Sequence, residues 1–403
     1  MGFIRHKFIG KWIRFQKICV GGFASYWIRK ILDFFSIFIS KLRQMKLSLK
    51  NSTIPQDVYV ALYGINNDTL WSIYNFSAGT LDVCYTGVTK AMDYMVSLGT
   101  GITIANLPNI SSGIILISYN QLPNDFAVVA DGNGNAAVQC PSFLSGTTDY
   151  NTVFNMVELT LSGSIYADIT NVDFFSTPIE IHMTGHNNDH SYIDERKGKM
   201  KYDRDTVFEK YEEAVKGTDY EKLVVKNGKE YVRILAPQHG VNYDLIPTDY
   251  WDKYVNDCWG HYSGNSIYFT TTLGGYTGRT DGDVLKVSGE TGALLYTYQK
   301  PGPNLAFDIF GCAGTLAAPN NEYGAIAARL GAAINRSVLM NDNQPDCDDT
   351  TYYKLTGSTN LYAAALHECY EDGTTYAFPF DDVCGGSSTL SCQIPGELVV
   401  TIL

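Results

Sequence analysis

The chain has 403 residues, more than one hydrophobic core usually organises, so we expect two lobes or two domains. It is rich in Tyr (28), Phe (19) and Gly (37), and 18% of its residues are charged, which indicates a globular protein with much sheet and excludes a disordered chain. The chain has 30 basic and 42 acidic residues, and residues 1–50 contain eleven of the basic residues and one of the acidic ones. Residues 51–403 therefore contain 19 basic and 41 acidic residues, a net charge of −22. A body this acidic repels nucleic acid and anionic membrane, and it suits a neutral ligand such as a glycan.

Residues 1–50 form a basic leader that allows three interpretations. MGFIRHKFIGKWIRFQK is similar to the positive region of a signal peptide, but the apolar runs after it are broken by Arg29, Lys30 and Asp33. Neither run reaches the roughly 18–20 residues of a membrane span, and no small-residue cleavage site follows. The leader is an unusual signal or anchor, a basic segment on a membrane surface, or sequence upstream of a start at Met45. We exclude residues 1–50 from the fold argument.

The first body segment, from Ile54 to about Ile181, contains short apolar runs separated by turns. The runs are VYVALYG, GIILISYN, FAVVADGNG, MVELTLSG and SIYADITNV. Strands of four to eight residues with turn signals between them indicate a β-sandwich or barrel.

The composition changes at Gly185, where helices join the strands. TVFEKYEEAVKG predicts a helix, with Thr206 and Glu209 as a capping box and Gly217 as its C-terminal stop. Two dipeptides, Asn227-Gly228 and Asp281-Gly282, predict hairpin turns. The segments GAIAARLGAAINRSVL and LYAAALHECYED predict further helices, and GELVVTIL predicts a final strand. Sheet, then helix with sheet, then sheet implies two lobes whose chains interleave.

Eight of the nine cysteines lie beyond the leader, scattered without CxxC spacing. They are Cys84, Cys140, Cys258, Cys312, Cys347, Cys369, Cys384 and Cys392. Such an even, dispersed set favours up to four disulfides over a zinc site. Glycosylation sequons are also present, at Asn51, Asn67, Asn75, Asn109 and Asn335. Together these features predict a secreted, disulfide-bonded glycoprotein.

Several reaction classes have no motif in this sequence. There is no P-loop, GxGxxG, HExxH or Gly-x-Ser-x-Gly element. His182, His186 and His190 are evenly spaced, but a spacing of four brings ligands together only on a helix, and their surroundings resemble strand and turn. We therefore expect neither a metal nor a cofactor, and the acidic groups remain as reactive candidates.

The stretch VELTLSGSIYADITNVDFF carries three carboxylates in sequence that otherwise resembles sheet. On a strand over residues 157–161, Glu158 points away from the apolar face. If residues 162–164 form a tight hairpin loop, Glu158 falls directly opposite Asp168, and two opposed carboxylates repel unless one is protonated. Asp173 lies roughly 17 Å further along an ideal strand, so it approaches Glu158 only if the chain bends. A solvated face, a close dyad and a more distant pair all remain possible on this pattern.

The chain from about Ile54 to Leu403 resembles the family 64 glycoside hydrolases, the thaumatin-like endo-β-1,3-glucanases. Six collinear segments carry the resemblance: VELTL…ADITNVDFFSTPI, KLVVKNGKEYVRILAP, YTGRTDGDVL, DIFGCAGTLA, GAIAARLGAAINRSVL and YAAALHECYEDGTTYAFPFDDV. YAFPFDDVCGGSSTLSC is also similar to an aromatic-Asp-Asp stretch of simpler thaumatin-like proteins.

The resemblance implies a mainly β fold with an α/β part, in a glucanase-like unit of residues 51–403. A thaumatin-like β-sandwich or barrel lobe (about 54–185, 264–300 and 375–403) and a mixed α/β lobe (about 186–263 and 301–374) would flank a wide groove for β-1,3-glucan. The family cleaves with inversion, using a Glu in a V-E-x-T strand and an Asp in the following V-D-F segment. These match Glu158 as general acid and Asp173 as general base.

Inversion requires carboxyl groups about 6.5–9.5 Å apart, which favours Asp173 over the closely opposed Asp168 and requires a turn between these two residues. The resemblance also implies substrate-binding positions at Thr160, Tyr166, Thr170, Asp381 and Asp382. Tyr166 stands where the family is expected to have Trp. The two late aspartates either line the groove or cap the turn before Cys384.

Two main hypotheses follow. The first is a secreted, monomeric, inverting endo-β-1,3-glucanase that cuts laminarin- or curdlan-type glucan of cell walls or storage polymers into short oligosaccharides. The second is a non-hydrolytic thaumatin-like β-glucan-binding protein, because the interval between the matched Glu and Asp is one residue shorter here than in bacterial members. A membrane-tethered wall-remodelling protein is a third, and it requires the leader to be retained. None of the three requires nucleic acid.

Overall fold

The computed structural model describes residues 45–52, 57–120, 122–355 and 357–403. Lys46–Leu403 forms one compact unit, and the expectations for residues 1–44 of the leader lie outside the described residues. The folded unit begins earlier than expected, because Lys46–Asn51 forms strand β1 instead of belonging to the leader. Leu47 and Leu49 of this strand are buried in the core. Among the described helices, none combines the length and the apolar character needed to cross a membrane.

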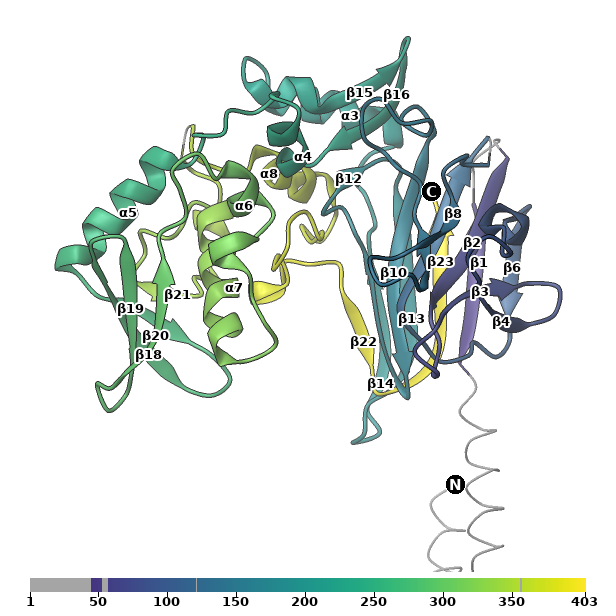
Figure 1. Cartoon of the computed structure of the whole chain (residues 1–403), viewed down its shortest axis with the longest axis horizontal. Helices are drawn as coiled ribbons and strands as arrows, with labels where there is room; N and C mark the ends of the chain where they lie inside the picture. Colours follow the sequence, from purple (N-terminus) through teal and green to yellow (C-terminus); the bar gives the residue numbers. More distant parts are fainter. Residues whose placement is uncertain (1–44, 53–56, 121, 356) are drawn as a thin grey trace, which may run out of the picture. The chain divides into compact units, whose positions relative to one another are not determined.

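Two large sheets form the β-rich part of the unit (Figure 1). The first has the order β14 (Tyr192–Lys197), β13 (Ile179–His186), β23 (Ile394–Ile402), β1 and β6 (Gly101–Ile104). The second has the order β22 (Leu390–Cys392), β11 (Ser164–Ile169), β10 (Phe154–Ser162), β7 (Ile110–Tyr119), β2 (Val58–Ile65), β3 (Trp71–Asn75) and β4 (Thr80–Val83), with β5 (Val96–Ser97) on β2. Strand β11 of the second sheet contacts β13 and β23 of the first. The predicted β-sandwich is therefore confirmed.

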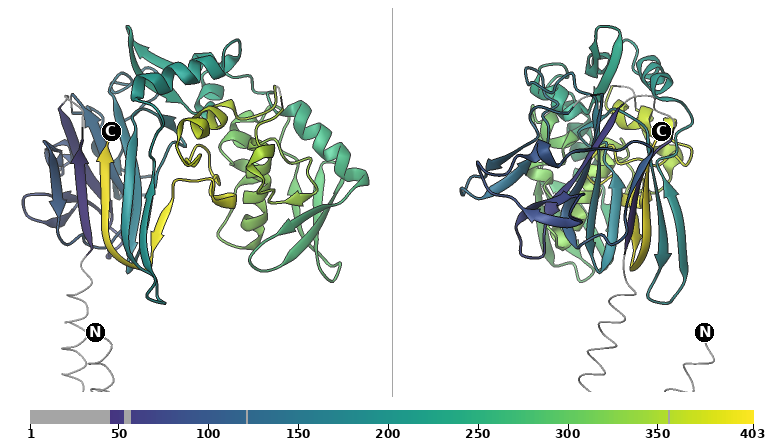
Figure 2. Two further views of the ribbon diagram at one scale, coloured as in Figure 1. Left: turned by 180° about the vertical axis from the view of Figure 1, so that it is seen from behind. Right: turned by 90° about the vertical axis from the view of Figure 1, so that its right-hand side faces the viewer.

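Smaller elements accompany this sandwich. A short 3₁₀ helix, η1 (Ala91–Tyr94), contacts β3, and a two-stranded ribbon consists of β8 (Ala127–Ala130) and β9 (Ala136–Gln139). Strand β23 lies between β13 and β1, and its pairing with β1 is parallel (Figure 2). The first described strand and the last one are thus neighbours in the same sheet.

The mixed α/β part contains the remaining strands and most of the helices. One sheet has the order β12 (Phe174–Phe175), β16 (Glu230–Leu235) and β15 (Val224–Asn227), and another has β20 (Leu294–Gln299), β19 (Val284–Gly289), β18 (Gly275–Asp281), β17 (Ile267–Thr270) and β21 (Asn343–Gln344). The α-helices are α3 (Arg204–Ala214), α4 (Pro237–Asn242), α5 (Asp252–Gly264), α6 (Ala306–Phe310), α7 (Glu322–Asn335) and α8 (Leu361–Cys369). Short 3₁₀ helices are η2 (Asp219–Leu223), η3 (Gly314–Leu316), η4 (Asp349–Thr351) and η5 (Val383–Gly385).

Strands β17 to β20 pair with other strands than the sequence analysis predicts. We expected residues 264–300 in the β lobe, but these strands pair with one another and with β21. Strand β18 also contacts α5, and β20 contacts η3. The predicted turns at Gly228 and Gly282 are confirmed, with φ of 64° and 57°, in the left-handed region that glycine adopts without strain.

Helix α3 shows how local sequence sets an element. It begins one turn before the predicted capping box, because the Asp203 side chain accepts a hydrogen bond from the Thr206 N–H at 2.9 Å. Aspartate is at least as good an N-cap as threonine, so the predicted cap at Thr206 was wrong by one turn. The predicted helix is confirmed, and it buries Val207, Phe208 and Tyr211 on one face.

The prediction of a disulfide-bonded chain, with up to four bridges, is confirmed for one bridge. Within the described residues one disulfide forms, Cys347–Cys384, and six cysteines are free. Most of these thiols are buried and pack as small apolar groups; the Cys312 Sγ, for example, lies 3.2 Å from the Pro379 carbonyl oxygen. Asn335 of the last predicted sequon is fully buried at the end of α7, so the folded chain offers no glycan site there.

Candidate active site

Glu158 and Asp168 lie directly opposite each other on β10 and β11, as the predicted hairpin requires. Gly163 makes the tight turn with φ of 80°. The same register pairs Thr160 with Tyr166, so all four side chains share one face of the hairpin. Alternate residues of both strands face the core instead, where they are buried. The sequence pattern therefore predicted this part of the site correctly.

A cavity of about 400 Å³ covers this face of the hairpin. Its lining is Trp71, Ser112, Gly113, Ile114, Glu158, Leu159, Thr160, Tyr166 and Asp168. The register of β10 against β7 shifts between Leu159 and Leu161, which marks a β-bulge beside the cavity. Gly113 is required there, because a Cβ atom at this position would lie 2.8 Å from the Leu159 carbonyl oxygen. Tyr166 is 55% exposed and offers an aromatic ring to a ligand.

The chain leaves the second sheet immediately after β11, which is the turn that the sequence predicts between Asp168 and Asp173. Thr170 forms an isolated parallel bridge with Tyr376, and strand β12 then pairs with β16 in another sheet. Buried Asn171 fixes the turn: its Nδ2 donates to the Tyr370 hydroxyl at 2.9 Å and to the Thr375 hydroxyl at 2.8 Å. The site therefore spans the junction between the sandwich and the mixed α/β part.

Asp173 follows this turn and pairs with His239 of helix α4. The His239 Nε2 lies 2.7 Å from the Asp173 Oδ1. The Asp173 carbonyl also accepts a hydrogen bond from the Ala236 N–H at 2.9 Å, at the start of the same helix. Phe143 packs edge-on against the His239 ring, with centroids 4.9 Å apart. The Asp173 side chain remains 44% exposed, so it is held in place and still accessible to water.

Both opposed carboxyl groups of the hairpin bind protons more tightly than usual. Glu158 is exposed as a residue, but partial desolvation of its carboxyl group is the main cause of its raised pKa. The Asp173 charge adds to the rise, and the Thr170 hydroxyl opposes it. Burial, then the charges of Glu158 and Asp382, raise the pKa of Asp168 to about 7. A carboxylic acid with a raised pKa keeps its proton closer to neutral pH, as a general acid must.

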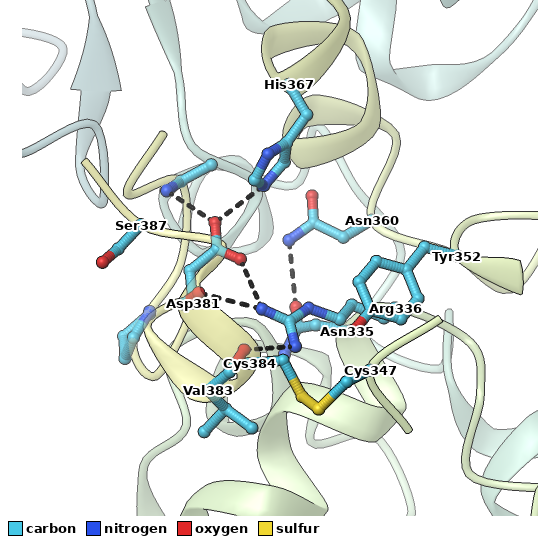
Figure 3. A network of polar contacts seen from close by, with 12 residues as sticks. Asn335, Arg336, Cys347, Tyr352, Asn360, His367, Asp381, Val383, Cys384 and Ser387 are labelled. Atoms are coloured by element: carbon cyan, nitrogen blue, oxygen red, sulfur yellow. Dashed lines mark hydrogen bonds and ion pairs between the residues drawn. A yellow bond between two sulfur atoms is a disulfide. The ribbon is translucent and has the colours of Figure 1, made fainter. Parts of the chain in front are cut away.

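Asp381 lies in a buried ionic network and does not face the groove (Figure 3). Its Oδ1 accepts from the Arg336 Nη2 at 2.9 Å, and its Oδ2 lies 2.9 Å from the His367 Nε2. The Ala377 N–H also donates to the Asp381 Oδ2 at 3.1 Å. With no exposed area, Asp381 contacts no ligand in this arrangement. Its placement fits the structural alternative, in which it holds the chain before Cys384.

The charges of this network support one another. Burial opposes ionisation of Asp381, but His367 and Arg336 outweigh it and hold the pKa of this carboxyl below its usual range. Burial alone would lower the pKa of His367, and the Asp381 charge and hydrogen bond reverse this and raise it. The adjacent Asp382 is exposed, and its charge acts on Asp168, so it faces the acidic side of the site.

Sequence reasoning missed three residues of the site. His239 is 66 positions from Asp173, and Trp71 lines the cavity from a distant strand. Tyr376 has a pKa raised by burial and then by the charges of Asp382, Asp168 and Glu158, so its hydroxyl lies among these carboxylates. The local signal that could have pointed to His239 is the segment APQH, with Pro237 in the first turn of a helix directly after a strand.

No three His, Cys, Asp or Glu side chains meet as a metal site within the part of the chain that the structure describes. His182 and His186 lie on strand β13, as their sequence context predicts. The His182 Nε2 lies 2.6 Å from the Asp194 Oδ1, and His186 packs against Tyr192.

Glu158, Asp168 and the aromatic Tyr166 line one cavity, and a third carboxyl group, Asp173, follows the turn after β11. Carboxyl groups in pairs are the reactive groups of most glycoside hydrolases. Residues 43–402 match the family model described as beta-1,3-glucanase. The chain therefore belongs to glycoside hydrolase family 64, as the sequence resemblance implies.

Relatives and solved structures agree with this assignment. The chain is 32% identical over 287 residues to a glucan endo-1,3-beta-glucosidase of Cellulosimicrobium cellulans, and 31% identical to one of Arthrobacter sp. (strain YCWD3). Each match covers 69% of this chain and 49% of the relative, so the similarity spans about half of each relative. A laminaripentaose-producing beta-1,3-glucanase, solved with laminaritetraose, is 26% identical with a TM-score of 0.77, covering 89% of this chain and 98% of that protein. A beta-1,3-glucanase domain from Clostridium beijerinckii shares the fold, with 22% identity, a TM-score of 0.77, and coverage of 89% of this chain and 98% of that domain.

Proposed function

We propose that the chain is an inverting endo-β-1,3-glucanase with Glu158 as general acid and Asp173 as general base. The observation that carries this proposal is the pairing of roles: Glu158 has a raised pKa partly because of the Asp173 charge, while the Asp173 side chain is partly open to water and held by His239. An acid that keeps its proton and a base that stays accessible to water are the two groups that inversion requires.

The proposed reaction uses both carboxyl groups in one displacement. Glu158 donates its proton to the glycosidic oxygen as the bond from that oxygen to C1 breaks. Asp173 accepts a proton from the water whose oxygen bonds to C1 on the opposite face of the sugar. His239 contacts the Asp173 Oδ1, so it orients the carboxylate and does not itself contact the sugar. The product then has the inverted configuration at C1.

Substrate contacts are proposed at residues that share the cavity face. Tyr166 supplies an exposed ring for stacking on a sugar, and Trp71 lines the same cavity. Thr160 lies beside Glu158, and Thr170 bonds it. The exposed Asp382 is retained as a groove residue, whereas Asp381 is not, because it is fully buried.

The test is hydrolysis of laminarin and curdlan, with the anomer of the first product followed by NMR. We expect wild-type protein to release oligosaccharides of inverted configuration, and Glu158→Gln and Asp173→Asn to lose nearly all activity. Glu195→Gln is the matched control, because Glu195 is exposed on β14 and belongs to no cavity face described above. Full activity in both active-site variants, or a product of retained configuration, would contradict the assignment.

A non-hydrolytic β-glucan-binding protein remains the alternative function. It rests on the Glu158-to-Asp173 interval, which is one residue shorter than the family pattern. Binding to insoluble curdlan without any soluble product would select it. Secretion, a monomeric state and a membrane contact through a retained leader are further proposals, and N-terminal sequencing of the mature product with gel filtration would test them.

A further inference from the structure

Asp168 has no role in the reaction proposed above, although it belongs to the same cavity as Glu158. The register places the two residues directly opposite each other on adjacent strands. In an antiparallel pair this arrangement brings the Cβ atoms to about 4.5–5.5 Å, close enough for the carboxyl groups to interact. The Asp168 Oδ1 is buried and has no hydrogen-bond partner among the described residues.

Among the described residues, the charges that act on the Asp168 carboxyl group are both negative. Glu158 lies opposite it on β10. Asp382, which directly precedes η5, and Tyr376, a few residues earlier, also interact with it electrostatically. On its other side, β11 pairs with β22, where the uncharged Ser391 is opposite Tyr166 and so lies on the same face of the sheet as Asp168. A buried carboxylate among negative charges is costly, and a proton on one of the two opposed groups relieves the repulsion.

We propose that Asp168 is a positioning residue that shares a proton with Glu158 across the hairpin and returns a proton to it after each cleavage. This inference rests on the proposed hydrolase function. After Glu158 has protonated the leaving oxygen, the pair holds no proton; Asp168 takes one from solvent, its O–H bond then breaks and an O–H bond forms on Glu158. Asp173 meanwhile releases to solvent the proton that it took from water. Protons therefore balance over one turnover.

The protonation behaviour of both groups supports this arrangement. The pKa of Asp168 is raised to about 7, and that of Glu158 is also raised. Two carboxyl groups this close titrate as a pair. The doubly protonated pair loses its first proton at a lower pH, and the remaining proton stays on the pair until the pH approaches neutrality, because its loss would leave two negative charges side by side. The pair can therefore hold one proton where an isolated surface carboxylate has none.

The pH dependence of kcat/KM on laminarin tests the proposal with Asp168→Asn and Asp168→Glu. Asparagine keeps the shape of the side chain but removes its charge and its exchangeable proton. We therefore expect the decline of kcat/KM on the alkaline side of the pH profile to occur about one pH unit lower than in wild type. Glutamate keeps a titratable group and should restore most of the limb. An Asp168→Asn limb that coincides with the wild-type limb would overturn the proposal.

A second readout does not depend on hydrolysis. NMR titration of ¹³C-labelled carboxyl groups should show that Asp168→Asn lowers the pKa of Glu158 and that Glu158→Gln lowers the pKa of Asp168. Reciprocal shifts in a protein that hydrolyses nothing would overturn the hydrolase function but keep the shared proton. Independent titration of the two groups would overturn the shared proton whether or not the protein is active. Variants are compared after circular dichroism shows a native fold.

Discussion

The Nε2 of His239 lies 2.7 Å from the Oδ1 of Asp173, and the two residues come from different elements 66 positions apart. Helix α4 carries the histidine, and the turn after β11 carries the aspartate. A second contact, from the Ala236 N–H to the Asp173 carbonyl, ties the same two segments together. The proposed base is thus fixed by both its side chain and its backbone.

This relationship predicts a specific kinetic effect of His239. Removing the ring in His239→Ala frees the Asp173 carboxylate to rotate, and a small misplacement of a catalytic group reduces kcat on the order of 10- to 100-fold. The KM for laminarin should change little, because His239 contacts Asp173 and not the cavity lining. His239→Gln retains a hydrogen-bond donor and should recover part of kcat. Equal kcat in His239→Ala and wild type would contradict this role.

The network around Asp381 predicts a stability maximum at mildly acidic pH. The Asp381 pKa is lowered from 3.8, so its contribution is present above that value and is lost as the pH falls through the folded-state pKa. The His367 pKa is raised from 6.5, so its contribution is present below that value and is lost as the pH rises through the folded-state pKa. Urea unfolding from pH 3 to 9 should therefore show the greatest stability between these two ordinary values.

Breaking this network should be costly. Arg336→Met leaves the buried Asp381 carboxylate without its guanidinium partner, for an expected loss of about 3–5 kcal/mol in the free energy of unfolding. His367→Gln should lose less, and it should also flatten the decline of stability on the alkaline side. Arg279→Met is the control, because the exposed Arg279 bonds Ser266 at the surface. A difference below 1 kcal/mol between Arg336→Met and this control would contradict the prediction.

Asp168 predicts a pH effect of the opposite sign to that of Asp381. Its pKa is raised from 3.8 to about 7, so the folded state loses stability as the pH rises through this interval. The loss is on the order of 2–4 kcal/mol by the conversion of pKa shifts into free energy. Asp168→Asn should remove it, so the variant gains on wild type between pH 4.5 and 8 in urea unfolding. A constant difference across that range would count against the buried, protonated carboxyl.

Tyr166 predicts an effect on binding. Its exposed ring lies on the cavity face beside the carboxylates, so Tyr166→Ala should raise the KM for laminarin by roughly 2- to 10-fold, the range expected for loss of an aromatic contact. Tyr166→Trp supplies the larger ring that the family resemblance predicts at this position and should bind at least as tightly as wild type. Tyr192→Ala, at an exposed ring on β14, is the control. Unchanged KM in Tyr166→Ala would exclude the stacking role.

Local relationships were the ones that the sequence could predict. Alternation and a glycine turn were sufficient for the register that opposes Glu158 and Asp168, because both strands of the hairpin lie within a few residues of that turn. The turn before Asp173 followed from the spacing that inversion requires. Helix α3 was found from its apolar face, although its cap was placed one turn late.

Long-range relationships could not be predicted in this way. The contact between Asp173 and His239, and the burial of Asp381 by Arg336, depend on which elements pack together, and no local periodicity specifies that. The pairing of the cysteines could not be predicted for a similar reason. An even count permits disulfides, but only the folded backbone decides that Cys347 reaches Cys384 while Cys312 remains a buried thiol.

The parallel pairing of β1 with β23 has a consequence for how the protein is made. Lys46 aligns with Glu397 and Asn51 with Ile402, and β23 also separates β1 from β13. The first sheet therefore lacks its middle strand until Ile402 has left the ribosome, and the emerging chain must wait with exposed apolar edges. Such closure between distant segments slows folding, so this sheet assembles only after β23 has been synthesised.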